Sequence, residues 1–376
     1  MSIKFNEPYI AGKELEYIKQ VFENGFFAGN GPFTEKVQNL LAEKYQVKKV
    51  LLTHSCTAAL EMSAILLRVG PGDEVILPSY TFPTTASSFL RTGAKLVFVD
   101  VDPLTMMMDS RDVENKITVN TKVIVPVHYG GIACDMENIM RIASKYDIHV
   151  VEDAAQGLDS SLNNQWLGTI GTFGCISFHE TKNIHAGLAG ALFINDESFY
   201  DRAVAVWERG TNRQQVLKGL ADKYSWVELG SSNYPSELQA AFLLAQIESI
   251  DENVAYRKEI YTAYFQALSP MQDLGYFSLP LIKGNRKLNY HSFFMMFNSE
   301  SECDRIREHL KAQEIMAYIG YVPLHSSAMG LSLGYTNEDL PVTERMSKNV
   351  LRLPFHNNMT LEDVAKVCDG IKECFK

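Results

Sequence analysis

The sequence predicts an α/β protein whose larger domain holds a mostly parallel sheet and whose smaller C-terminal domain is also α/β. Short apolar runs alternate with helix-like stretches between residues 48 and 194, a long helix-like stretch begins at residue 237, and the pattern changes again from about residue 276. Short buried strands separated by helices are typical of βαβ units. Because 376 residues exceed one average domain, we divide the chain into residues 1–250 and 251–376.

The first half of the chain supplies the strands of the larger sheet. Each strand-like run is short, rich in branched apolar residues and followed by a turn or a helix signal. The expected strands are Val50–Thr53, Glu74–Leu77, Lys95–Asp100, Lys122–His128, His149–Asp153 and Cys175–Phe178, with helices at Thr57–Arg68 and Met136–Tyr146. Parallel sheets bind ligands beyond the carboxyl ends of their strands, so a site is expected just after these runs.

The second half begins with helical patterns and then becomes mixed. A helix at residues 198–209 leads into a long polar loop at residues 210–234, and loops of this length are usually functional or mobile. Residues 237–268 form one or two long helices. The smaller domain is expected to contain strand Tyr290–Phe297, helix Glu302–Ala312, strand Ile315–Ile319 and helix Leu361–Phe375.

Composition disfavours several classes of protein. The formal net charge of −10 argues against nucleic acid or an anionic membrane as a general partner. No apolar run approaches the roughly 18 residues needed to span a bilayer, and the first residues lack an apolar signal core. The six cysteines are scattered without a Cys-x-x-Cys pair, which is typical of free thiols in a reducing compartment. We therefore expect a soluble cytoplasmic protein.

Lys182 points most directly to a chemistry. It lies just beyond the strand-like run Cys175–Phe178, and Asp153 ends another such run 29 positions before it. A lysine amine forms the Schiff base with the aldehyde of pyridoxal phosphate, and an acid beside the pyridinium nitrogen keeps the ring an electron sink. The pair therefore predicts a pyridoxal-phosphate enzyme that handles amino groups. The alternatives are a solvated surface lysine and an aspartate that caps the following helix.

Several other residues are candidates for holding the cofactor. Ser55, Cys56 and Thr57 join the first strand to a helix, whose free N-terminal amides suit a phosphate; simple helix capping is the alternative. Phe82 follows the second strand and could stack on the cofactor ring or belong to the core. Gln156 could reach the phenolic oxygen of the cofactor or lie at the surface.

A further group of residues could face the substrate. His179 precedes the lysine and is either an acid–base partner or a core residue. Arg213 ends Arg209-Gly-Thr-Asn-Arg213 in the long loop; arginine suits bidentate phosphate contacts, although exposed loop arginines are common. Tyr321 and His325 lie in the smaller domain and could also reach the substrate.

Competing motifs are absent from the sequence. The glycines of Gly168–Gly174 are spaced G-x-x-G-x-x-G rather than as the dinucleotide motif G-x-G-x-x-G. The chain also lacks G-x-x-x-x-G-K-[ST], H-E-x-x-H and G-x-S-x-G. No nucleotide-triphosphate loop, metal site or serine-nucleophile site is therefore predicted.

Taken together, these segments resemble the DegT/DnrJ-type sugar aminotransferases of the aspartate aminotransferase superfamily, fold type I. The matching segments are Asn6–Pro8, Ser55–Leu60, Pro78–Phe82, Val123–His128, Glu152–Gln156, Ser177–Asn183, Leu238–Ala241, Pro323–His325 and Leu353-Pro354. Any one of them is modestly specific, whereas the ordered set is strong. Within the family, Ser177–Asn183 and Arg209–Arg213 are most similar to transaminases that form dTDP-4-amino-4,6-dideoxygalactose.

The resemblance implies a role for each position. Lys182 would bind the cofactor and shuttle the proton, while Asp153 would pair with the ring nitrogen. The resemblance places Gln156 at the phenolic oxygen, Phe82 over the ring, and Cys56, Thr57 and Ser177 at the phosphate. It also implies a homodimer with a shared active site, in which Ser232 or Asn233 reaches the neighbouring subunit's phosphate.

Three departures from the family pattern stand out. The stretch Ala186–Gly190 has no glutamate where the family often has Gly-Glu-Gly-Gly, Ser232 stands at the usual asparagine position, and Cys56 replaces a common glycine. The resemblance implies amino transfer from L-glutamate to a dTDP-4-keto-6-deoxyhexose. The alternatives are a 3-amino product, a deoxygenation, or a non-catalytic dimeric scaffold.

Overall fold

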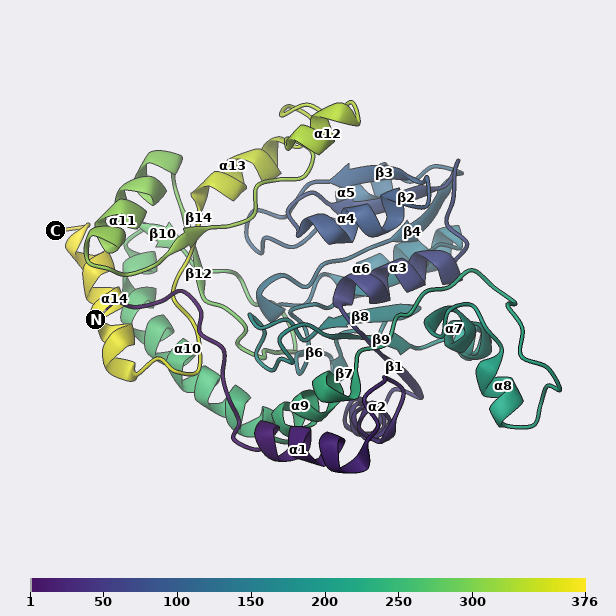
Figure 1. Cartoon of the computed structure of the whole chain (residues 1–376). Coiled ribbons are helices and arrows are strands. Elements are labelled where there is room, and N and C mark those ends of the chain that lie inside the picture. The colour runs from purple at the N-terminus through teal and green to yellow at the C-terminus, as the bar shows by residue number, and fades with distance from the viewer. Residues whose placement is uncertain (1) are drawn as a thin grey trace.

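The computed structural model describes residues 2–376 and confirms an α/β fold, in which helices cover both faces of a seven-stranded sheet (Figure 1). The strand order is β1-β9-β8-β5-β4-β2-β3. The strands are β1 (Lys49–Thr53), β2 (Glu74–Pro78), β3 (Lys95–Val99), β4 (Thr121–Ile124), β5 (His149–Asp153), β8 (Phe173–Ser177) and β9 (Gly190–Ile194). Only β9 runs antiparallel to its neighbours, so the sheet is mostly parallel as predicted.

Alternate residues of each strand pack into different apolar clusters, which is the two-residue period of a sheet covered on both faces. In β2, Val75 and Leu77 join one cluster while Ile76 joins another. The first cluster is completed by helices α3 (Cys56–Leu66), α4 (Pro83–Leu90) and α7 (Tyr200–Trp207), and the second by α5 (Ser110–Asn115) and α6 (Met136–Tyr146). Each strand therefore reads as a continuous apolar run.

The edge of the sheet at β1 and β9 is covered by helices from distant parts of the chain. These are α2 (Pro32–Tyr45) and α9 (Glu237–Glu248), with α1 (Glu14–Asn24) packed on α9 (Figure 1). The segment that carries α8 (Arg213–Leu217) projects from the large sheet on the side away from the C-terminal elements (Figure 1). The long loop expected at residues 210–234 thus contains one short helix.

A second sheet of order β10-β12-β14-β13 forms the centre of the C-terminal part. Its elements are α10 (Ile250–Asp273), β10 (Phe277–Ser278), β12 (Phe294–Phe297), α11 (Glu300–Ala312), β13 (Tyr318–Ile319), α12 (Ala328–Ser332), α13 (Pro341–Asn349), β14 (Val350–Arg352) and α14 (Leu361–Glu373). A three-stranded sheet joins β11 (Arg286–Lys287) to β6 (Ser161–Leu162) and β7 (Gln165–Trp166). Ile3 bridges to Ile315 and packs in the C-terminal core, so both chain ends lie at this side (Figure 1).

Some expected elements end elsewhere, for local reasons. The strand expected at Lys122–His128 stops at Ile124, because Pro126 has no amide to donate to a ladder. The strand expected from Tyr290 begins only at Phe294, since Tyr290 adopts a left-handed φ of 53°. The helical stretch after Glu237 is two helices joined at Ser249.

The structure bears on domain layout and membrane spanning only in part. Helix α10 begins at Ile250, close to the proposed boundary, and the division into 1–250 and 251–376 stays a prediction. Within residues 2–376, no helix has both the length and the apolar character required to cross a bilayer.

Glu237 joins two of the helices that cover the sheet edge. It is the first residue of α9, and its buried carboxylate accepts hydrogen bonds from the amides of Gly31, Phe33 and Thr34 at 2.7–3.1 Å. These amides lie at the N-terminus of α2, where the first N–H groups of a helix have no intrahelical acceptor and favour a negative charge. The carboxylate therefore caps α2 from outside that helix.

Replacing this cap should destabilise the fold measurably. We expect Glu237→Ala to lower the free energy of unfolding by about 3 kcal/mol, because buried donors lose a charged acceptor. The control is Glu248→Ala on the same helix, which removes a partly exposed ion pair with Lys13 and should cost below about 1 kcal/mol. Thermal unfolding followed by circular dichroism measures both, and equal losses would contradict the capping role.

Candidate active site

A cavity of about 450 Å³ opens where the parallel strands of the large sheet end and the second sheet begins. It is lined by most of the residues that the sequence singled out: Ser55, Cys56, Thr57, Phe82, Asp153, Gln156, Ser177, His179, Lys182 and Tyr321. Lys182 and Asp153 therefore face one cavity, as the interpretation of the sequence required. Both come from segments just after, or at the end of, adjacent strands β8 and β5.

Four predicted residues do not line this cavity. His325 is fully buried and bonds through Nδ1 to the hydroxyl of Ser79 at 2.7 Å. Arg213 begins α8 and its guanidinium donates to the Glu208 carboxylate at 2.7 Å. Ser232 is exposed and Asn233 is buried, with Asn233 Nδ2 donating to the Val206 carbonyl at 3.0 Å. In a single chain, then, none of the four reaches the other candidates.

Asp153 is held in place by its neighbours at the end of β5. One carboxylate oxygen accepts a hydrogen bond from the Thr85 hydroxyl at 2.7 Å, and the other accepts from the Ala155 amide at 3.2 Å. Burial raises the pKa of Asp153 above its ordinary value, although these hydrogen bonds and nearby Lys182 act in the opposite direction. The carboxylate is thus oriented, and no cation of residues 2–376 contacts it. A pyridinium N–H would supply that partner.

Burial also lowers the pKa of Lys182, while the neighbouring Cys56 and Asp153 oppose that shift. Arg352 adds a like charge that lowers it further. An amine attacks an aldehyde only when it is unprotonated, so these surroundings favour the reactive form of the lysine. The cavity therefore provides an activated amine beside an oriented acid.

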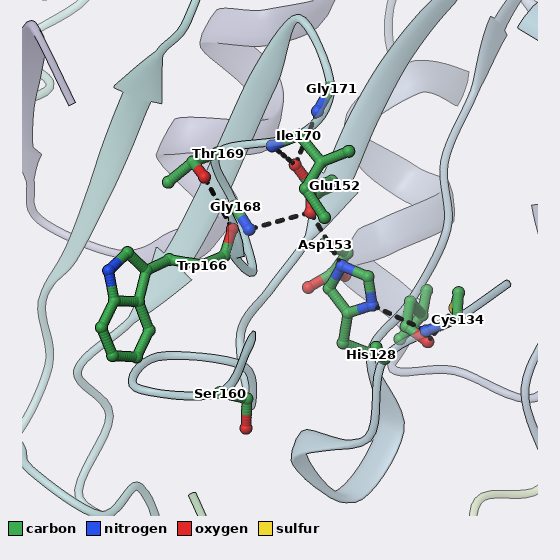
Figure 2. Close-up of polar contacts among 12 residues, drawn as sticks. His128, Cys134, Glu152, Asp153, Ser160, Trp166, Gly168, Thr169, Ile170 and Gly171 are labelled. Atoms are coloured by element: carbon green, nitrogen blue, oxygen red, sulfur yellow. Dashed lines mark hydrogen bonds and ion pairs between the residues drawn. The ribbon is translucent and has the colours of Figure 1, made fainter. Parts of the chain in front are cut away.

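A second buried carboxylate supports the end of β5 from the opposite side of the strand. Figure 2 shows Glu152 accepting hydrogen bonds from the amides of Gly168, Ile170 and Gly171 at 2.7–2.8 Å. His128 Nε2 lies 3.0 Å from the same carboxylate. Because the Cys134 amide donates to His128 Nδ1 at 3.2 Å, Nδ1 accepts and Nε2 carries the proton toward Glu152. Four donors thus hydrogen-bond the buried Glu152 carboxylate and fix the position of the end of β5.

The N-terminus of α3 offers an anion site on the cavity wall. Ser55 caps the helix by accepting from the Ala58 amide at 3.1 Å. No hydrogen bond within residues 2–376 uses the amides of Cys56 and Thr57, which therefore stay available to a phosphate. A Cβ on Gly190 would lie 2.4 Å from the Cys56 nitrogen, so only glycine allows β9 to approach this helix start.

The opposite wall carries an amide and aromatic rings. Gln156 accepts from the Gly130 amide at 2.6 Å and donates through Nε2 to the Tyr321 hydroxyl at 3.2 Å. The Phe82 and Tyr321 ring centroids lie 6.3 Å apart, and Phe82 lines the cavity with 55% of its surface exposed, which leaves it available to a ligand. A flat, polar-edged ring fits between such groups.

Other residues of the cavity were missed from the sequence. His291 and Arg352 line the cavity. Thr85 contributes by donating the hydrogen bond that orients Asp153. Ser292 Oγ and Arg352 Nε are buried at the cavity without a hydrogen-bond partner within residues 2–376, which indicates a polar ligand. The arginine within the apolar run Leu351-Arg-Leu-Pro354 was the one signal that could have flagged this wall.

The residues present fit pyridoxal phosphate on these structural grounds. An anion site at a helix start, an oriented acid without a cation, an activated lysine and an exposed aromatic ring occur together in one cavity. Each of these features matches one part of the cofactor: phosphate, ring nitrogen, aldehyde and ring face.

Comparison with known proteins gives the class of the protein. Residues 8–372 match the DegT/DnrJ/EryC1/StrS aminotransferase family, and the chain belongs to this family. It is 28% identical over 373 residues to GDP-perosamine synthase of Escherichia coli O157:H7, covering 98% of this chain and 97% of that one. It is also 28% identical over 382 residues to the spore coat polysaccharide biosynthesis protein SpsC of Bacillus subtilis, covering 100% and 97%.

Solved structures agree with this assignment. Spr1654 of Streptococcus pneumoniae in its PMP-form superposes with a TM-score of 0.92 at 26% identity, covering 100% of this chain and 98% of that one. The same protein is also known in a PLP-form and an apo-form. The protein is therefore a pyridoxal-phosphate-dependent sugar aminotransferase with the fold type I architecture.

The electrostatics of Asp153 predict that its carboxylate lowers the stability of the cofactor-free protein and strengthens cofactor binding. An acid whose pKa is higher in the folded than in the unfolded state loses stability as the pH rises through the folded pKa, and burial raises the pKa of Asp153. We therefore expect cofactor-free Asp153→Asn to unfold at a higher temperature than cofactor-free wild type at pH 7. The difference should shrink as the pH falls toward the ordinary value of 3.8.

The same variant should bind pyridoxal phosphate about tenfold or more weakly, because a charge-assisted hydrogen bond to the ring nitrogen is lost. Asp369→Asn, on an exposed ion pair with Lys372, is the control and should change neither property. Thermal unfolding at several pH values and a cofactor titration make the two measurements. A variant with lower stability and unchanged affinity would refute the role given to Asp153.

Proposed function

We propose that the protein transfers the amino group of L-glutamate to C4 of a dTDP-4-keto-6-deoxyhexose. The product would be a dTDP-4-amino-4,6-dideoxyhexose, with the galactose configuration favoured. The observation that carries the proposal is the shared cavity of Lys182, Asp153 and Gln156. The choice of sugar follows only the resemblance of Ser177–Asn183 and Arg209–Arg213 to transaminases of this type. The six cysteines are free thiols, in keeping with the expected cytoplasmic location.

Three residues of the cavity, Lys182, Asp153 and Gln156, have a task in this reaction. When bound, pyridoxal phosphate supplies an electron-withdrawing ring that lets the α-carbon of an amino acid release its proton. Lys182 Nζ takes up that proton and returns it on the other side of the transfer, which requires the unprotonated amine that burial favours. Asp153 holds the proton of the ring nitrogen, and Gln156 Nε2 hydrogen-bonds the phenolic oxygen.

The substrate side of the cavity is less polar than the family pattern. Leu188 lies in the loop where relatives often carry a glutamate, and it lines the cavity with half of its surface exposed. An apolar side chain at this point suits the deoxygenated face of a 6-deoxy sugar better than a hydroxyl-rich one. His179 and Tyr321 line the same cavity and are proposed to contact the sugar.

A second subunit would complete the site. The segment 217–229 exposes a run of large apolar side chains in the single chain: Leu217, Leu220, Tyr224, Trp226, Val227 and Leu229. Exposed apolar groups on this scale usually mark an interface. Between the two candidates for the partner's phosphate contact, Ser232 is exposed, whereas Asn233 is hydrogen-bonded inside its own chain. We therefore propose a homodimer in which Ser232 serves the neighbouring cavity. Arg213 is about half exposed beside its Glu208 partner, and we propose that it reaches the same neighbouring cavity.

The alternatives concern the position of the new amine and the nucleotide. A 3-amino product keeps the same cofactor chemistry and differs only in how the sugar lies in the cavity. The relative in Escherichia coli is named for a GDP-sugar, so the base is a second variable. Membership of an aminotransferase family disfavours the non-catalytic scaffold that the sequence left open.

A panel of keto sugars tests the proposal. The protein, pyridoxal phosphate and L-glutamate are incubated with dTDP- and GDP-linked 3-keto and 4-keto-6-deoxyhexoses, and NMR of the product locates the new amine. We expect amination of the dTDP-4-keto sugar, with the amine at C4. Lys182→Ala should keep the fold, lose the cofactor chromophore and give no product. Preferred amination at C3, or of the GDP-sugar, would overturn the substrate assignment alone.

The shared site predicts complementation between inactive variants. Lys182→Ala removes the amine, and Ser232→Glu would place a negative charge against the phosphate of the neighbouring cavity. When the two proteins are unfolded and refolded together, half of the dimers are hybrids with one intact site each. Activity should therefore rise to about one quarter of wild type, since dimers form at random. Hybrids without recovered activity would show that each chain builds its own site.

A further inference from the structure

His291 is a cavity residue to which the chemistry above gives no task. It precedes β12 in the C-terminal part of the chain and lines the same cavity as Lys182. Both side chains also line a second void of about 10 Å³ beneath that cavity. The two side chains therefore line the same two spaces although 109 positions separate the residues in the sequence.

Hydrogen bonds determine which ring nitrogen of His291 carries the proton. Asn183 Nδ2 donates to the Asn289 carbonyl at 2.8 Å, which fixes the orientation of the Asn183 amide. Asn183 Oδ1 lies 2.9 Å from His291 Nδ1 and can only accept. The proton is therefore on Nδ1, and Nε2 is left as an acceptor that makes no hydrogen bond within residues 2–376.

A chain of hydrogen bonds also fixes the position of the His291 ring. The backbone amide of His291 donates to Asn289 Oδ1 at 3.0 Å. Asn289 Nδ2 in turn donates to the carbonyls of Gln156 and Leu158, both at 2.7 Å. Asn183 follows Lys182 directly in the chain, so the same amide that orients the imidazole belongs to the segment that positions the amine.

The charges around the ring keep it neutral. Burial lowers the pKa of His291 well below its ordinary value of 6.5. The cations Arg257 and Arg352 act in the same direction, and so does Lys182 whenever it is protonated. No carboxylate contacts the ring within residues 2–376, because Asn183 is the one side chain bonded to it. On the lysine side, Cys56, Asp153 and Arg352 are the other groups that act on the amine. Nε2 therefore stays an acceptor at neutral pH.

We propose that His291 is a positioning residue for Lys182: its Nε2, kept unprotonated by the Asn183 amide, accepts a hydrogen bond from the free lysine amine and directs the amine's lone pair toward the reacting carbon. The inference rests on the proposed role of Lys182 as the proton carrier. No proton passes to the imidazole, because Nδ1 keeps its own throughout and Nε2 serves only as an acceptor. A purely structural histidine would pack between the same elements without affecting the amine.

Asn183→Asp separates these two roles. A carboxylate at this position would accept from Nδ1–H and stabilise the imidazolium, which raises the pKa of His291 toward neutrality. Below that pKa, Nε2 would carry a proton and could no longer accept from the amine. The L-glutamate half-reaction, followed by the change in cofactor absorbance, should then show a new acidic limb with about tenfold loss per pH unit. The limb should vanish in Asn183→Asp combined with His291→Gln.

Substitution of the histidine itself gives the second arm. His291→Leu should slow the half-reaction about 10- to 100-fold with little change in KM, since an orienting contact is lost. His291→Gln offers an acceptor oxygen and should recover most of the rate. Carbon-13-labelled histidine NMR of the cofactor-free protein gives a readout independent of turnover: the pKa of His291 should lie well below 6.5 in wild type and should be raised in Asn183→Asp.

Two results would overturn the inference. They are titration of wild-type His291 near 6.5, or a half-reaction in His291→Leu with wild-type rate and pH profile. None of these measurements uses a keto sugar, so a wrong sugar assignment leaves them intact. Should Lys182→Ala still form the cofactor chromophore, the fault would lie with the role of Lys182 rather than with His291. If Asn183→Asp does not fold, the leucine and glutamine pair with wild-type NMR still decides the question.

Discussion

The active site depends on a buried carboxylate that has no contact with any reacting group. Glu152 lies in the middle of the sheet with three amides and a histidine donating to it. These bonds tie the turn before β8 and the loop after β4 to one point on β5. Asp153, the next residue, faces the cavity because neighbouring side chains on a strand point to opposite sides. Loss of the Glu152 carboxylate would leave four buried donors without an acceptor and would free the strand end that carries Asp153.

The cavity uses burial to oppose the charged forms of its two principal groups. Burial raises the pKa of Asp153 and lowers the pKa of Lys182. A neutral amine suits attack on an aldehyde, whereas the acid becomes useful once a ring nitrogen offers it a proton. Burial thus disfavours the charged form of each group until the cofactor provides it with a partner. Cofactor binding is therefore linked to the stability of the folded protein.

Both parts of the chain contribute residues to the cavity. The large sheet supplies the anion site at α3, which follows β1, and the acid and the lysine, which lie at the ends of the neighbouring strands β5 and β8. The C-terminal part supplies His291, Tyr321 and Arg352 from segments around the second sheet. Asn183 and Asn289 hydrogen-bond across this seam, so the two parts are connected directly beneath the reactive amine.

The sequence by itself determined the α/β class and the boundaries of strands such as His149–Asp153, because apolar periodicity is a local signal. It also singled out Lys182, Asp153 and Gln156 as candidate site residues, because a lysine after a buried strand is a local signal as well. Tertiary structure alone decided the rest. His325 has the same motif context as Tyr321 yet is buried outside the cavity, and His291 lies in an unremarkable run yet lines the same cavity as the lysine. Which side chains share a cavity depends on contacts between segments more than a hundred residues apart, and no local pattern in the sequence encodes those contacts.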